Sequence, residues 1–151
     1  MNSFIPSAPP SLSGVIPGDG WYPDLPVADF AATTGLGVGF SPDLIRETLS
    51  GAMLECMAGV AAWRAGQTAA SLAGVPGPQL GNDSAAVLHW RRAVFALARA
   101  RLLGLRPDHD ATKDGLDRSD ALRQTADTWL AIHAQALRAL TSGGRVVVEA
   151  L

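Results

Sequence analysis

The chain has 151 residues, 48% of them apolar, a length that suits one domain with its own core. Its 12 Lys and Arg against 14 Asp and Glu give a formal net charge of −2, which excludes a strongly basic nucleic-acid binder of the histone kind. One cysteine excludes a disulfide framework and a cysteine-built metal site, and no apolar run reaches the roughly 18–20 residues of a membrane span.

The first 24 residues predict an extended N-terminal arm. Six of the ten prolines lie within residues 1–26, and proline fixes φ, removes an amide donor and disfavours helix in the residue before it. The apolar residues of the arm, among them Phe4, Trp21 and Tyr22, are too sparse to form a core. We therefore expect the arm to be disordered or laid across a partner, with its end pinned by the aromatic pair.

Residues 25–142 predict an all-α domain, a small bundle of three long helices and one short helix. The short helix covers residues 27–33, and the three glycines within residues 35–39 end it because of their backbone entropy. The first long helix follows the N-cap Ser41 and covers residues 42–66. Its buried face, at the 3.6-residue period, carries Ile45, Leu49, Ala52, Met53, Cys56, Val60 and Trp63, while Leu54 points the other way.

The second long helix is predicted to be the central one. It follows a loop at residues 74–81, is capped by residues 82–84 and runs to about Gly104. Its apolar residues cover about half of its circumference, which is typical of a helix contacted by several neighbours. These residues are Val87, Trp90, Val94, Phe95, Leu97, Ala98, Leu102 and Leu105.

A polar loop at residues 106–115 leads to the last helix, which we expect to be capped by Asp117 or Ser119 and to run to about Thr141. Gly143 and Gly144 then end it. Its expected buried residues are Leu122, Ala126, Trp129, Leu130, Ile132, Ala136, Leu137 and Leu140.

Residues 143–151 form a strand-like C-terminal tail. The β-branched run Val146, Val147 and Val148 between Arg145 and Glu149 has no partner strand elsewhere in the sequence. A lone strand leaves its amides and carbonyls unpaired. We therefore expect the tail either to pair with another chain or to fray.

The sequence contains no convergent set of catalytic or metal-binding groups, and we expect no enzyme activity, no metal and no cofactor. Asp108, His109 and Asp110 resemble metal ligands, but adjacent loop residues rarely all point at one ion, so a solvated turn is the preferred interpretation. We interpret His133 as a satisfied core histidine without a neighbouring Ser or Cys, and Cys56 as a small apolar core residue. With no secretion signal at its start, the chain is expected to be soluble and made in a reducing cytoplasm.

Arginines on the central helix predict a basic stripe. Arg92 and Arg99 lie seven residues apart on its polar side, and Arg106 follows the helix. The stripe faces either a partner, such as DNA or an acidic ring, or solvent. The acidic residues after the helix, Asp108, Asp110, Asp114, Asp117 and Asp120, provide a zone of opposite charge that would attract such a stripe between copies.

Arg91 differs from these arginines because it projects into the apolar arc of the central helix. Its guanidinium must reach solvent or meet a carboxylate. We expect a structural ion pair with Glu55, with Asp127 or with an acid of a neighbouring subunit.

Four stretches occur in a recognisable order: the aromatic and proline-rich start (residues 4–6, 21–24 and 29–30), residues 61–64, residues 89–94 with 97–102, and residues 111–115 before the closing helix and the Val-Glu near the C-terminus. In this order they resemble the head completion protein family of temperate contractile-tailed phages, the gene L product family, over almost the whole chain. The sequence departs from the family pattern at Gly115-Leu116 and in the lower charge of the closing helix.

The resemblance implies a structural head–tail connector of the virion neck. Such a protein would assemble in the host cytoplasm as a ring, dodecameric by analogy, on the portal after DNA packaging. It would seal the head, contact further neck or tail-terminator proteins and offer a platform for the tail. On this interpretation Arg145–Glu149, Trp21, Tyr22 and Phe4 bind the portal or a neighbouring subunit, and the basic stripe faces the DNA channel or an adjacent ring.

Two other classes of function stay open on the sequence. One is a helical regulatory or binding module that acts as a small oligomer. The other is a small helical enzyme that uses His133 or the loop at residues 108–110.

Overall fold

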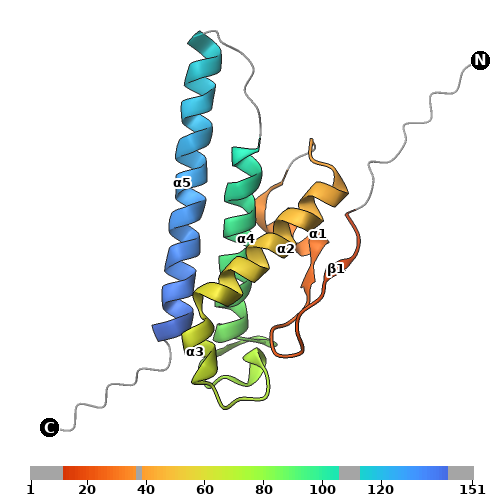
Figure 1. Ribbon diagram of the computed structural model, residues 1–151, viewed down its shortest axis with the longest axis vertical. Coiled ribbons are helices and arrows are strands. Elements are labelled where there is room, and N and C mark those ends of the chain that lie inside the picture. Colours follow the sequence, from red (N-terminus) through yellow and green to blue (C-terminus); the bar gives the residue numbers. More distant parts are fainter. Residues whose placement is uncertain (1–11, 37–38, 106–112, 143–151) are drawn as a thin grey trace, which may run out of the picture.

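The computed structural model describes residues 12–36, 39–105 and 113–142, and in these ranges the protein is mostly helical (Figure 1). Helix α4 lies between α5, which runs antiparallel to it on one side, and α2, which crosses it on the other. In chain order the elements are β1 (Val15–Ile16), β2 (Leu25–Pro26), α1 (Val27–Thr34), α2 (Pro42–Gly59), α3 (Ala61–Ala65), the 3₁₀ turn η1 (Leu72–Gly74), β3 (Gln79–Leu80), β4 (Asp83–Ser84), α4 (Ala85–Gly104) and α5 (Lys113–Ser142).

Helix α4 is the central helix, as the width of its apolar arc predicted. It begins where the Ser84 hydroxyl accepts a hydrogen bond from the Val87 amide at 3.2 Å. Trp90, Val94 and Leu102 are fully buried, and α1, α2 and α5 all pack against this helix. Leu105 was expected to belong to the buried arc but is exposed, because the helix ends one residue before it.

Helix α2 begins as predicted, with the Ser41 hydroxyl accepting from the Leu44 amide at 3.2 Å, but it ends earlier. The single helix expected over residues 42–66 is broken at Val60, whose φ of −112° and ψ of 15° are not helical. Val60 keeps its side chain buried at this break. The short helix α3 continues from there and brings Trp63 edge-on to Trp21, with 6.0 Å between ring centroids.

Helix α5 is longer than the sequence indicated and less buried. It begins at Lys113, so the caps expected at Asp117 and Ser119 lie inside the helix, and its first turns project beyond the end of α4 (Figure 1). Ala136 and Leu140 are buried, but Leu130 is 39% exposed. A helix covered mainly by one neighbour buries a narrower stripe than one surrounded by several, which is why this expected core residue is at the edge.

The described part of the arm folds back onto its own subunit. Strand β1 pairs antiparallel with β2, with Ile16 opposite Leu25, and both residues are buried. The Asp19 carboxylate accepts hydrogen bonds from the amides of Trp21 and Tyr22, both at 2.9 Å, and these bonds, that of Tyr22 first, lower the pKa of the carboxyl. The turn between the strands is therefore held by the arm's own backbone.

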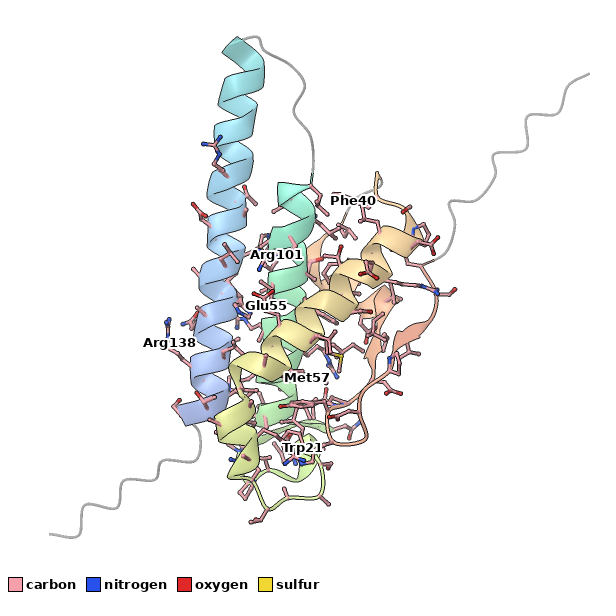
Figure 2. The ribbon with its side chains drawn as sticks, viewed as in Figure 1. Trp21, Phe40, Glu55, Met57, Arg101 and Arg138 are labelled. Atoms are coloured by element: carbon pink, nitrogen blue, oxygen red, sulfur yellow. The ribbon has the colours of Figure 1, made fainter. Side chains whose placement is uncertain are left out.

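Trp21 and Tyr22, expected to bind a partner, lie instead in the subunit's own core. The Trp21 indole donates to the Ala69 carbonyl at 2.9 Å, and the Arg64 guanidinium lies 4.0 Å from the centroid of its ring (Figure 2). Tyr22 is 5% exposed and stacks on Trp90, with ring centroids 4.2 Å apart. The third arm residue expected at an interface, Phe4, lies outside the described residues.

A second strand pair lies in the segment predicted as a loop at residues 74–81. Strand β3 pairs antiparallel with β4, with Leu80 opposite Asp83. Gly81 in the turn between them has a φ of +62°, a conformation that glycine adopts without steric cost. The sequence signal for this hairpin is weak because each strand contributes only two residues.

The burial of Tyr22 predicts that the end of the arm is needed for stability. Replacing Tyr22 with Ala should lower the free energy of unfolding by about 3–5 kcal/mol, because a buried ring and its stacking partner lose their contacts. Replacing it with Phe is the matched control and should be close to neutral, since the Tyr22 hydroxyl is buried without a hydrogen-bond partner. Urea denaturation followed by circular dichroism measures both, and a loss below about 1 kcal/mol for Tyr22→Ala would contradict the packing of the arm.

Candidate interaction surface

A largely apolar groove of about 520 Å³ runs over the face of α4 between α1 and α5. Phe95 and Ala96 of α4 form part of its floor, Trp129 of α5 lies along one wall, and Thr33 of α1 lies along the other. Its lining residues are Thr33, Thr34, Leu88, Arg91, Arg92, Phe95, Ala96, Trp129 and Ile132. Among these described lining residues the charged ones are two arginines, and none is a carboxylate.

A smaller hollow of about 210 Å³ continues the groove along the seam between α4 and α5. It is lined by His89, Arg92, Gln135, Ala136 and Ala139, so it shares Arg92 with the larger groove. The lining residues of α5 run from Trp129 to Ala139, ten residues apart, or about 15 Å along a helix. We call the two hollows together the seam groove.

Arg91 forms the structural ion pair that its position predicted, but with a different partner. Its Nη1 lies 3.4 Å from Oδ2 of Asp83, and the two side chains are 29% and 41% exposed. The predicted partner Glu55 instead accepts both hydrogen bonds of Arg101, at 2.9 and 3.0 Å (Figure 2). The hairpin β3–β4 places Asp83 below the first turns of α4, which local sequence patterns do not reveal. Nε of Arg91 is buried without a hydrogen-bond partner in the structure.

Of the residues predicted to form a basic stripe, Arg92 lies at the α4–α5 seam. Arg92 is exposed at the point where the two hollows of the seam groove meet. Arg99 is half-buried. Arg106, the third residue of the stripe, and the tail Arg145–Glu149 lie outside the described residues.

The interior of the bundle holds a cysteine and a histidine side by side, contrary to the expectation that His133 has no such neighbour. Sγ of Cys56 lies 3.9 Å from Nδ1 of His133, which is itself 2.9 Å from the carbonyl oxygen of Ala93. A carbonyl oxygen only accepts hydrogen bonds, so Nδ1 of His133 carries the ring proton and donates a hydrogen bond to the Ala93 oxygen.

This arrangement does not activate the thiol. Burial, with a smaller contribution from the Glu55 carboxylate, raises the pKa of the Cys56 thiol to about 12. A nucleophilic cysteine needs a lowered pKa and a base that accepts its proton, whereas here the nearest ring nitrogen is a donor. The pair therefore fills space and satisfies a backbone carbonyl, in line with the interpretation of His133 as a satisfied core histidine.

Metal binding finds no support in the described residues, where no three His, Cys, Asp or Glu side chains come together. Asp108, His109 and Asp110 lie outside these residues. The helices that the structure describes also include none that is long and apolar enough to cross a membrane.

Comparison with protein families identifies the chain. Residues 16–151 match the profile of the family described as phage head completion protein (GPL). The chain belongs to the phage head completion protein family. The comparison covers the arm from β1 onward, the whole described bundle and the tail, and it agrees with the resemblance found in the sequence. Searches of curated proteins and of solved structures found no match.

Membership assigns the protein a structural role in the phage head and makes it a component of the virion. The family is a structural one, and a head completion protein acts through contacts with other head and tail proteins. Surfaces that remain uncovered in one subunit, such as the seam groove, are thus the first candidates for its functional sites.

The environment of Cys56 predicts a chemically silent thiol. At pH 8 the folded protein should react with a thiol reagent at least about a thousandfold more slowly than the protein unfolded in urea, because a pKa near 12 rather than 9 leaves that much less thiolate. The rate of colour release from an aromatic disulfide reagent measures this difference. Rapid labelling of the folded protein would show that the thiol is accessible and ionised, against the packing described here.

Proposed function

We propose that the protein docks on the portal after DNA packaging, completes and seals the filled head, and provides a platform for attachment of the tail. The observation that carries this proposal is the family match over residues 16–151. In this role the protein forms a ring of identical subunits, dodecameric by analogy, in the virion neck. Its partners are the portal, further neck or tail-terminator proteins and other copies of the same chain.

The surface of the described subunit supports a role in assembly. The seam groove is lined largely by apolar side chains beside two arginines, and concave, mostly apolar hollows with a few polar groups are typical of binding sites. The chain has 17% charged residues, fewer than the quarter common in soluble domains. Both features suit a subunit that works surrounded by other chains.

The tail is the segment that we propose makes the connection. Strand β1 pairs with β2 and β3 pairs with β4, so among the described residues only the outer edges of these two-residue strands are open to the β-branched run Arg145–Glu149. An added strand gains affinity from backbone hydrogen bonds and specificity from alternate side chains in pockets. Pairing with the portal or with an adjoining subunit would provide both.

Arg92 would contact an adjacent ring or subunit in this assembly rather than an isolated stretch of DNA. Its position on the α4–α5 seam places it beside apolar hollows, whereas non-specific DNA binding relies on open basic surface. For the other two arginines of the stripe, Arg99 and Arg106, we propose direct contact with the packaged DNA.

Removal of residues 145–151 tests the proposed function. The truncated protein should keep its helical circular dichroism spectrum, because the residues of the described core pack against one another, but it should no longer attach to DNA-filled, tailless heads. Electron microscopy of the vertex and retention of DNA measure attachment and sealing. The variant Arg138→Glu, which changes an exposed side chain pointing away from the bundle (Figure 2), is the control and should attach normally.

If the truncated protein attached to heads as well as the full chain, the tail would have no part in docking. If the full-length protein itself failed to bind the vertex of filled heads, the proposed function would be wrong.

A further inference from the structure

We infer that the seam groove of each subunit binds the segment Arg145–Glu149 of a second copy of the chain. This inference rests on the proposed function, because it describes how subunits of the proposed ring hold one another. The inference assigns the seam groove as the binding surface for the segment Arg145–Glu149.

The dimensions of groove and segment agree. An extended strand rises about 3.3 Å per residue, so five residues span about 16 Å. The seam groove extends about 15 Å along α5, from Trp129 to Ala139. A strand is also the narrowest regular element, and the total volume of the two hollows suits a few side chains rather than a whole helix.

The apolar character of the two surfaces agrees as well. Leu88, Phe95 and Ile132 line the larger hollow and are joined there by the half-buried Trp129. Val146 and Val148 lie on the same side of an extended chain, so both would enter the hollows while the backbone lies over the α4–α5 seam at the surface.

Charge determines where Glu149 of the segment lies in the groove. The described lining of the groove carries Arg91 and Arg92 and no carboxylate, and within the described residues the Arg91 guanidinium pairs with Asp83 at 3.4 Å. Glu149 is the one carboxylate within Arg145–Glu149. We place it beside Arg91 and Arg92, where it gains a charge-assisted hydrogen bond.

A second copy, rather than the same chain, is the occupant that fits the proposed ring. If the tail bound the seam groove of its own subunit, both the tail and the groove would be occupied within one copy. Neither would then be available to bind a second copy. Exchanged between copies, the same contact is heterologous: every subunit offers one groove and one tail, and repetition of the contact closes a ring when the rotation permits.

Mixing two variants, each defective in one surface, tests the inference. The tail variant carries Val146→Asp and Val148→Asp, and the groove variant carries Thr33→Trp and Arg92→Glu. Both groove positions are exposed, so the changes leave the core intact. Sedimentation velocity should show that the full-length protein self-associates with rising concentration and that each variant alone remains monomeric.

The equimolar mixture should form heterodimers and nothing larger. Each heterodimer joins the intact groove of the tail variant to the intact tail of the groove variant, and the two defective surfaces prevent further growth. The control variant Ala32→Trp with Arg138→Glu alters exposed residues of α1 and α5 that do not line the groove, and it should associate like the full-length protein.

A charge exchange tests the assigned contact directly. Arg92→Glu alone should weaken self-association about tenfold or more, the usual effect of reversing a charge at a close pair. Adding Glu149→Arg to the same chain should restore most of that loss. If the double variant were no stronger than Arg92→Glu, Glu149 would not face Arg92.

Either of two results would overturn the inference. One is a full-length protein that stays monomeric; the other is a mixture that forms no heterodimer although the full-length protein associates. In the second case, a variant with Thr33→Cys, Val148→Cys and Cys56→Ser shows whether the tail binds its own subunit. A disulfide that forms within single chains of this variant would identify such binding. Binding of the full-length protein to filled heads is read separately, so its failure refutes the proposed function and not this contact.

Discussion

The burial of helix α4 holds the molecule together. Trp90, Val94, Ala98 and Leu102 are fully buried, and α1, α2 and α5 each use α4 as a packing partner. Apolar burial stabilises at roughly 25 cal/mol per Å², so a helix covered on several sides contributes a large part of the folding free energy of a small domain. The arm joins the same core through the stacking of Tyr22 on Trp90. One side of α4, facing the seam groove, keeps a hollow that the described chain does not fill.

The sequence predicted those features of the fold that depend on neighbouring residues. The caps Ser41 and Ser84 and the periodic apolar faces of α2 and α4 located these helices because capping and amphipathicity are local properties. The packing of Trp21 on Ala69, 48 residues away, has no local signal. The break at Val60 was missed for the same reason, since tertiary contacts decide where a marginal helix end lies.

The candidate site was harder to predict than the fold because three separate elements form it. The position of Arg91 in an apolar arc correctly indicated an ion pair, but Asp83 became its partner only through the β3–β4 hairpin. Arg92 was recognised as a surface cation, although its place between two hollows depends on α5. Cys56 and His133 lie 77 residues apart in the sequence and meet only in the folded bundle, so neither residue predicted the other.

The docking of the arm has a consequence for the order of events during synthesis. Trp21 and Tyr22 leave the ribosome well before the residues that they contact, Trp63, Ala69 and Trp90. The arm can therefore not reach its final place until the first turns of α4 have been translated, and its aromatic pair stays solvated during that interval. Contacts between distant parts of a chain close late, and exposed apolar groups on nascent chains are substrates for chaperones. The nascent protein is thus most prone to aggregate before α4 emerges.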